Sequence, residues 1–194
     1  HYEFPAVDRF GGTDEDPVAI YHFDPGSSAT TVYDSSVNGN NLTIYGATSD
    51  INTGLSGDSV GSRSLKFDGT NDIASSSAEL SGFNFGTGSF SVSSWFRHSS
   101  TVSDTDTLIS QYGSSGYKIY MNSSGYICAG IDDDSTWGPD DSACSTTSYA
   151  DSKWHHVEMT KGLTTLTLYI DGNSAATKTI TATGNLSPGS PLFL

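Results

Sequence analysis

The stretch Thr165-Leu-Thr-Leu-Tyr-Ile-Asp-Gly172 decides the fold class. Leucine or isoleucine occupies every second position, which is the alternation of a strand buried on one face. The Asp171-Gly172 pair that follows suits the positive φ angles of a tight two-residue turn. The pattern therefore predicts an antiparallel hairpin whose second strand covers Ala175–Ile180.

Other short strand-like segments recur along the chain, separated by clusters of Gly, Asn, Asp and Ser. In Ser89–Arg97 apolar and polar residues alternate, and Trp95 falls on the polar face with Ser91 and Ser93. Helical periodicity is almost absent, and its best candidate, Ala74–Leu80, predicts a turn or two at most. We therefore predict an all-β protein, a two-sheet antiparallel sandwich. The further expected strands are Val18–Phe23, Leu42–Tyr45, Ser64–Phe67, Thr107–Gln111, Tyr117–Met121, Tyr126–Ile131 and Trp154–Thr160.

The charge of the chain excludes some partners. Eight basic residues stand against 22 acidic ones, for a net charge of −14. Nucleic acids and anionic lipid surfaces are bound mainly through Lys and Arg, so neither is an expected partner. No apolar run approaches the ~18 residues of a membrane-spanning helix. The sequence therefore predicts no nucleic-acid partner and no membrane insertion.

The two cysteines bear on location. Cys128 and Cys144 are the only pair, in a loop-rich chain that begins with His1 instead of Met. We predict that they form a disulfide and that the protein is extracellular or on the cell surface. Two buried reduced thiols are the alternative. N-glycosylation sequons at Asn41, Asn122 and Asn185 permit glycosylation without indicating it, because Ser and Thr are abundant.

Four segments stand in a fixed order along the chain. They are Ala19-Ile-Tyr-His-Phe-Asp24, Val32-Tyr-Asp-Ser-Ser-Val-Asn-Gly-Asn-Asn-Leu42, Ser64-Leu-Lys-Phe-Asp-Gly-Thr-Asn-Asp72, and Lys153-Trp-His-His-Val157 with Thr165-Leu-Thr-Leu-Tyr-Ile-Asp-Gly172. Together they resemble the laminin-G-like, concanavalin A-like jelly-roll domains of surface proteins, and the strand Ser89–Trp95 also fits the family. The resemblance covers about residues 18–194, so residues 1–17 are expected to be an N-terminal segment and acidic linker.

The resemblance implies a non-catalytic extracellular module for adhesion, or for recognition of a glycan or a cell-surface protein. It also implies a structural calcium ion near the N-terminal turns, with Asp24, Asp34, Asn38 and Asn40 as the matching ligands. Calcium takes six to eight oxygens, and carboxylates and Asn carbonyls supply them here. The alternative is that Asp34 and Asn38 only form turns.

The family usually closes with a strand that follows the position of Pro191–Leu194. The sequence stops at this position, so we expect a sandwich that lacks its own closing strand. A continuation of the chain, the segment His1–Phe10 or another chain would fill the opening. The alternative function is therefore a structural subunit of an extracellular filament or surface assembly, completed by strand exchange and self-associating through the N-terminal segment.

The expected ligand-contacting residues are Trp137, Tyr112 and Asp134, around the acidic loop Asp132–Asp141. The loop is not an EF-hand, because Trp137 stands where that motif needs Gly. No pair of catalytic carboxylates or nucleophile motif is present, so we predict no catalytic residues. A copper site formed by His1 with His155 or His156 is the remaining enzyme alternative.

Overall fold

The computed structural model describes residues 17–23, 30–45, 52–53, 63–136 and 138–194. The predicted N-terminal segment, residues 1–17, lies almost entirely outside these ranges. No helix of the described residues is long and apolar enough to span a bilayer.

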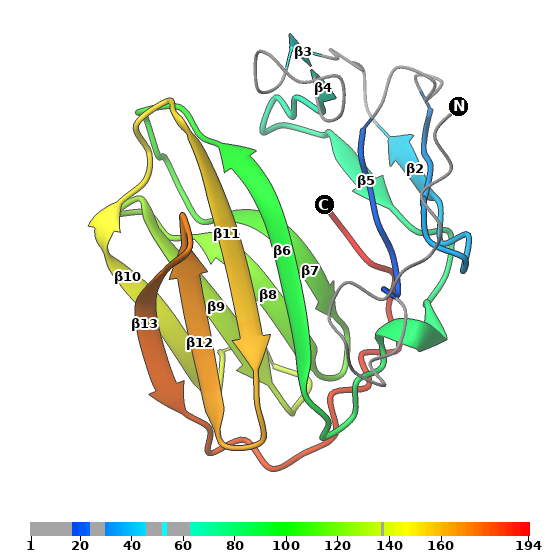
Figure 1. Cartoon of the computed structure of the whole chain (residues 1–194), viewed down its shortest axis with the longest axis vertical. Coiled ribbons are helices and arrows are strands. Elements are labelled where there is room, and N and C mark those ends of the chain that lie inside the picture. Colours follow the sequence, from blue (N-terminus) through cyan, green and yellow to red (C-terminus); the bar gives the residue numbers. More distant parts are fainter. Residues whose placement is uncertain (1–16, 24–29, 46–51, 54–62, 137) are drawn as a thin grey trace.

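Two antiparallel sheets are stacked as a sandwich (Figure 1). The front sheet has the strand order β13-β12-β11-β6, with β6 Phe90–Arg97, β11 Trp154–Lys161, β12 Thr165–Ile170 and β13 Asn173–Thr179. The sheet behind it has the order β10-β9-β8-β7, with β7 Asp106–Tyr112, β8 Gly116–Met121, β9 Tyr126–Asp132 and β10 Asp141–Ser148. The all-β sandwich predicted from the sequence is confirmed.

The C-terminal residues extend the back layer. Phe193 forms bridges to both Ser75 and Ser110, and the Phe193 N–H donates to the Ser110 carbonyl at 2.8 Å. The segment thereby joins β7 to a smaller sheet of order β1-β2-β5. Its strands are β1 Thr31–Val32, β2 Leu42–Tyr45 and β5 Ile73–Ser75; a separate pair is β3 Asn52–Thr53 with β4 Arg63–Ser64, and a 3-10 turn covers Ser81–Phe83. Among the described strands β6 and β13 are the two edges of the front sheet, and the absence of a closing strand stays a prediction.

The core lies between the two sheets. Leu166, Leu168 and Ile170 of β12 are buried, on the inward face that the alternation predicted. Ile119 and Ile127 of the back sheet belong to the same buried cluster. Burying each such side chain stabilises the fold by about 2 kcal/mol, so this layer is the main source of stability.

The hairpin that decided the fold class is confirmed. β12 and β13 pair through Ile170 and Asn173, with Asp171 at φ 51° and Gly172 at φ 76° between them. Both turn residues are thus in the left-handed region that an Asp-Gly turn supplies.

Two local predictions were wrong. Val18–Phe23 contains an isolated bridge at Tyr21 instead of a strand. Of Ser64–Phe67 only Ser64 lies in a strand. The stretch Ala74–Leu80, for which at most a turn or two was expected, is not helical, and Ala74 and Ser75 pair within the sheet as part of β5.

Strand β10 was not predicted, because its sequence, Asp-Ser-Ala-Cys-Ser-Thr-Thr-Ser, has no apolar alternation. Small and polar residues can still be buried here, because their hydrogen-bonding groups find partners within the protein. The Ser145 hydroxyl accepts a hydrogen bond from the Ile127 N–H at 3.1 Å and donates to the Thr147 carbonyl at 2.9 Å.

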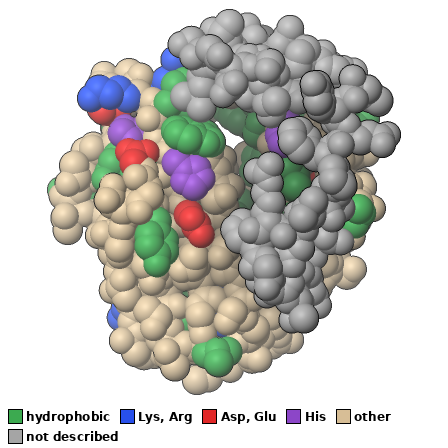
Figure 2. Space-filling model, viewed as in Figure 1, with side chains coloured by type: hydrophobic (Ala, Val, Ile, Leu, Met, Phe, Trp, Pro, Cys, Tyr) green, Lys and Arg blue, Asp and Glu red, His purple; other side chains and the backbone are tan. Residues whose placement is uncertain are grey.

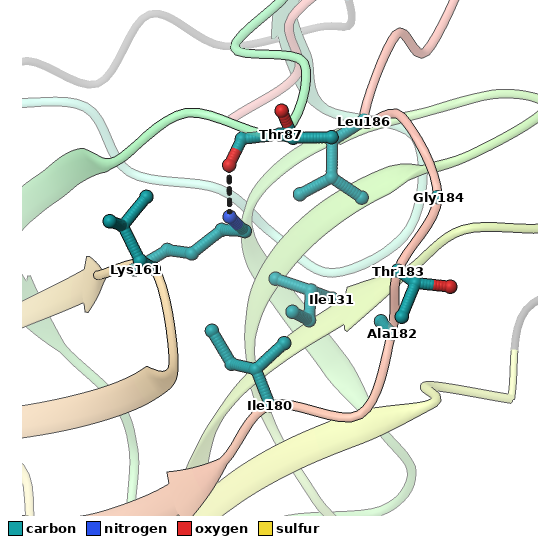
Figure 3. A pocket seen from close by; sticks show the side chains of 9 residues that line it. Thr87, Ile131, Lys161, Ile180, Ala182, Thr183, Gly184 and Leu186 are labelled. Carbon is teal, nitrogen blue, oxygen red and sulfur yellow. Dashed lines mark hydrogen bonds between the residues drawn. The ribbon is translucent and has the colours of Figure 1, made fainter.

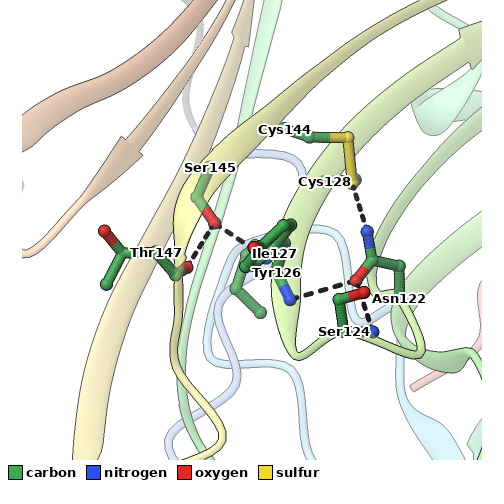
Figure 4. Close-up of a disulfide and its surroundings, with 8 residues drawn as sticks. All are labelled: Asn122, Ser124, Tyr126, Ile127, Cys128, Cys144, Ser145 and Thr147. Atoms are coloured by element: carbon green, nitrogen blue, oxygen red, sulfur yellow. Dashed lines mark hydrogen bonds between the residues drawn. A yellow bond between two sulfur atoms is a disulfide. The ribbon is translucent and has the colours of Figure 1, made fainter.

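The predicted disulfide is formed between β9 and β10 (Figure 4). Cys128 and Cys144 are direct partners in the register of the two strands. Beside them, the Asn122 carboxamide oxygen accepts the backbone N–H groups of Ser124 and Tyr126. The bridge and this turn together fasten one edge of the back sheet.

Candidate functional site

Two of the three predicted ligand-contacting residues meet at the end of the back sheet. Tyr112 ends β7, and its hydroxyl donates to the backbone carbonyl of Asp134 at 3.1 Å. The Lys118 ammonium lies 4.9 Å from the Tyr112 ring centroid, covering one ring face. Trp137, the third predicted residue, lies outside the described residues.

The acidic groups of this loop bind the loop itself. Asp132 is buried, and its carboxylate accepts the N–H groups of Asp134 and Gly138, each at 3.1 Å. Asp134 accepts the Thr136 N–H at 2.7 Å. Partial burial, together with the charges of nearby aspartates, raises the pKa of Tyr112. The hydroxyl and the carboxylates are therefore already engaged before any ligand arrives.

Two further aspartates of this region hold the segment 181–184 in place. The buried Asp141 carboxylate accepts the Thr181 N–H at 2.6 Å and the Ala182 N–H at 2.8 Å. Asp133 accepts the Gly184 N–H at 2.6 Å. Burial raises the pKa of Asp141, but these hydrogen bonds and the Lys178 charge lower it more, so the net pKa is below the usual value. Both aspartates are positioned to stabilise the fold.

The predicted calcium ligands are only partly described, because Asp24 lies outside the described residues. Asp34 Oδ1 accepts the N–H groups of Ile20 and Ser36 at 2.8 Å. Asp34 Oδ2 accepts the Ser36 hydroxyl at 2.7 Å and the Asn40 N–H at 2.8 Å. These four bonds occupy the acceptor positions of a carboxylate.

The neighbouring amides make the same kind of contact. Asn38 and Asn40 donate their side-chain N–H groups to the Val18 carbonyl at 3.1 and 2.8 Å. Asp34, Asn38 and Asn40 thus organise a turn through hydrogen bonds to backbone groups. No group of three acidic, His or Cys side chains in the described ranges could hold a metal ion. These hydrogen bonds are those expected of the turn-forming alternative, and the calcium site, which includes Asp24 outside the described residues, stays a prediction.

The three sequons differ in their surroundings. Asn41 and Asn185 are exposed. Asn122 is part of the turn beside the disulfide, where its carboxamide oxygen has two N–H partners. Glycosylation of all three stays a prediction.

A surface that the sequence analysis did not select is the outer face of the front sheet. Trp95 on β6 is 51% exposed there, and its ring centroid lies 5.3 Å from that of His156 on β11. The two residues are direct partners in the strand register. Figure 2 shows His, acidic and hydrophobic side chains on this face of the molecule. The sequence did contain a signal for this surface: the alternation of apolar and polar residues in Ser89–Arg97 places Trp95 on the polar face of a half-buried strand.

The same face carries more aromatic and polar groups. One step along the strands, the Arg97 guanidinium lies 5.3 Å from the Trp154 ring centroid. On the other side, Glu158 pairs with Tyr169 of β12. We call Trp95, His156, Arg97, Trp154, Glu158 and Tyr169 the aromatic face.

At one end of the aromatic face, His155 connects two turns of the chain, one at Asp151 and one at Asp171. His155 Nδ1 lies 2.8 Å from Asp171 Oδ2, and His155 Nε2 lies 3.1 Å from Asp151 Oδ1. Asp171 Oδ1 also accepts the backbone N–H of His156 at 2.9 Å. Partial burial lowers the pKa of His155, but the bonds to Asp171 and Asp151 raise it more, so the net pKa is above its usual value.

The copper alternative requires a free imidazole nitrogen. His1 lies outside the described residues, and both nitrogens of His155 already face carboxylates. His156 packs against Trp95.

Comparison with known proteins supports the resemblance. The family model described as the concanavalin A-like lectin/glucanases superfamily matches residues 67–194. No curated protein has significant sequence similarity to the chain.

Solved structures share the fold at low identity. The binding domain of Paraclostridial Mosquitocidal Protein 1 superposes with a TM-score of 0.64 at 19% identity, covering 85% of this chain and 43% of that one. The binding domain of Botulinum Neurotoxin DC in complex with SialylT gives 0.60 at 17%, covering 86% and 42%. The botulinum neurotoxin serotype D ligand binding domain in complex with N-acetylneuraminic acid gives 0.54 at 17%, covering 90% and 43%.

The chain thus spans less than half of the length of these solved structures, and the likeness shows the fold alone. The match to the family model assigns the chain to a family, because the matched residues 67–194 make up more than half of the sequence. The protein belongs to the concanavalin A-like lectin/glucanases superfamily.

Proposed function

We propose that this protein is an extracellular, non-catalytic module that binds a glycan on the aromatic face of its front sheet. The observation that carries the proposal is Trp95, a large aromatic side chain 51% exposed on a regular sheet. Exposed tryptophan is a frequent anchor of binding surfaces, because it buries much area with little loss of conformational entropy.

The chemistry of the face suits a sugar. The C–H groups of one face of a pyranose ring can stack on the Trp95 indole, as apolar surface on apolar surface. His156 and Glu158 flank the tryptophan on the neighbouring strand and offer hydrogen-bonding groups for sugar hydroxyls. Strand side chains held by the sheet register need little rearrangement to bind, which lowers the entropic cost.

The comparisons support the class of function. Binding domains of clostridial toxins share the fold, and two of their structures hold SialylT and N-acetylneuraminic acid. The identity is too low to transfer a ligand or a residue, so the sugar bound here is left to experiment. The Cys128–Cys144 disulfide supports an oxidising, extracellular location.

A glycan array followed by calorimetry tests the proposal. We expect the wild-type protein to bind a set of glycans, and Trp95→Ala to weaken the best of them at least tenfold. The matched control is Tyr33→Ala, because Tyr33 is 50% exposed but lies outside the two main sheets. Full affinity in Trp95→Ala, or no glycan bound by the wild type, would refute the proposal.

The second candidate is a subunit of an extracellular assembly. The observation that favours it is the position of β6 at one of the two edges of the front sheet among the described strands, where a segment from another chain could add. The segment His1–Phe10, which lies outside the described residues, is the proposed donor. Its deletion should then convert assemblies to monomers or aggregates, whereas an unchanged oligomeric state would exclude this candidate.

A further inference from the structure

A pocket opens at the end of the sandwich where β11 finishes and the chain passes residues 180–186 (Figure 3). Its cavity volume is about 260 Å³. Its lining mixes polar groups, among them Thr87 and Thr183, with the apolar side chains of Leu163, Ile180 and Ala182. The single cation in the lining is Lys161, and the pocket shares no residue with the aromatic face.

Lys161 is unusually buried for a lysine. It ends β11 on the inward-facing side, and only 6% of its surface is exposed. Its ammonium donates to the carbonyls of Thr87 and Gly88 at 3.1 and 3.0 Å. An ammonium has three N–H donors, so one donor remains after these two bonds.

No carboxylate is paired with this charge. The ion pairs found among the described residues all involve other side chains. No described carboxylate oxygen lies within 4.0 Å of the Lys161 ammonium. Burial lowers the pKa of Lys161, which is the signature of a charge removed from water without full compensation. A buried charge of this kind is stabilised strongly by an anion that reaches it.

The wall opposite Lys161 is held in a fixed position. Residues 181–184 are bound through their backbone N–H groups by the carboxylates of Asp141 and Asp133. Both carboxylates are therefore turned toward these amides. The pocket thus combines one wall held in place by backbone hydrogen bonds, a few apolar side chains and one cationic donor, and small-molecule sites use such a combination of apolar surface with a few placed polar groups.

We propose that this pocket binds a small carboxylate with an apolar body, whose carboxylate accepts the third Lys161 N–H while its hydrocarbon part packs on Leu163, Ile180 and Ala182, the apolar lining side chains that are not fully buried. Pockets for drug-sized ligands measure about 300–1,000 Å³, so this one suits a smaller molecule, such as a short-chain monocarboxylate. The site is separate from the glycan-binding surface and does not depend on it.

Methyl NMR of the whole chain tests the proposal, with hexanoate as the probe and hexanol as its uncharged counterpart. We expect hexanoate to shift the methyl signals of Leu163 and Ile180 saturably. In Lys161→Met, which keeps the linear stem and removes the charge, hexanoate should bind at least tenfold more weakly, whereas hexanol binding should not change.

Ala182→Leu provides a second variant in which Lys161 is retained and the added side chain occupies the cavity. It should abolish the hexanoate shifts, and its use keeps the proposal testable if Lys161→Met fails to fold. Absence of saturable shifts in the wild type, or equal hexanoate affinity in Lys161→Met, would overturn the proposal. Glycan binding should be the same in both variants, so failure here and failure of the glycan proposal are separate results.

Discussion

The acidic loop beside Tyr112 and the aromatic face around Trp95 offer similar functional groups in different states. In the loop, the Tyr112 hydroxyl bonds to the Asp134 carbonyl and the carboxylates bind backbone N–H groups. On the face, Trp95 is half-exposed and its neighbours project from a regular sheet. The side chains of the face are less occupied by hydrogen bonds within the protein than those described in the loop, and this difference supports the proposal that the face binds the ligand.

The largest expected effect concerns the buried acid that the loop region uses for folding. The Asp141 carboxylate accepts hydrogen bonds from three N–H or O–H groups. In Asp141→Asn, the amide group would place its own N–H donors against these donors. Because a buried charge network is broken, the free energy of unfolding should fall by about 4 kcal/mol in urea denaturation.

Asp134→Asn is the matched control, because Asp134 is exposed and has one such partner on this carboxylate. It should change stability by less than about 1 kcal/mol. Equal and small losses in both variants would mean that Asp141 is not a structural acid, and the contrast between the two regions would weaken.

Removing the disulfide should have the next largest effect. The bridge closes a loop with a sequence separation of 16, and Cys128→Ser with Cys144→Ser should lower stability by about 3 kcal/mol through the greater entropy of the unfolded chain. Glycan affinity should stay within twofold, because the cysteines are on the back sheet. A loss of binding in a variant that remains folded would contradict the separation of the two regions.

Asp34 extends the comparison to the N-terminal turns. Its four hydrogen bonds predict that Asp34→Ala lowers the free energy of unfolding by about 2 kcal/mol. The loss should be the same in excess calcium and in excess chelator. A wild-type melting temperature that falls on chelation, and no longer does so in Asp34→Ala, would instead establish the predicted calcium site.

The smallest effect is a pH dependence next to the aromatic face. The pKa of His155 is raised and that of Asp171 is lowered, while hydrogen bonds from Lys153 and His155, together with the Lys153 charge, hold the pKa of Asp151 at about 2. A raised histidine pKa contributes stability that is present below about pH 6.5 and is lost as pH rises through the folded value. The lowered aspartate values contribute stability that is present above about pH 4 and is lost on further acidification.

Stability should therefore be greater at pH 6 than at pH 8. In His155→Gln this difference should shrink, as measured by denaturant unfolding at both values. An unchanged difference would show that His155 does not link the turn at Asp151 to the turn at Asp171.

Much of the fold was predictable because the relevant signals are local. Alternation and the Asp171-Gly172 pair specify the β12–β13 hairpin without reference to the rest of the chain. Strand β10 could not be found in this way, because Asp141 and Ser145 enter the interior only with partners that are distant in sequence. The strand predicted at Val18–Phe23 was wrong, because an apolar run forms a strand only where a neighbouring strand pairs with it, and here the pairing is a single bridge at Tyr21.

The candidate site was less predictable than the fold. Sequence indicated Tyr112 and Asp134 because aromatic and acidic residues cluster in a loop, but whether those groups are free depends on tertiary hydrogen bonds. Trp95 was visible on the polar face of its strand. Its partners His156 and Glu158 come from another strand, and only the register of β6 with β11 places them beside it.

The most direct test of the central claim is amide and indole NMR mapping with the tightest glycan found on the array. The account predicts that the Trp95 indole N–H and the amides of His156 and Glu158 shift as the glycan is added. Signals of Tyr112 and residues 132–136 should stay where they are. Shifts confined to the loop, with the front sheet unaffected, would contradict it.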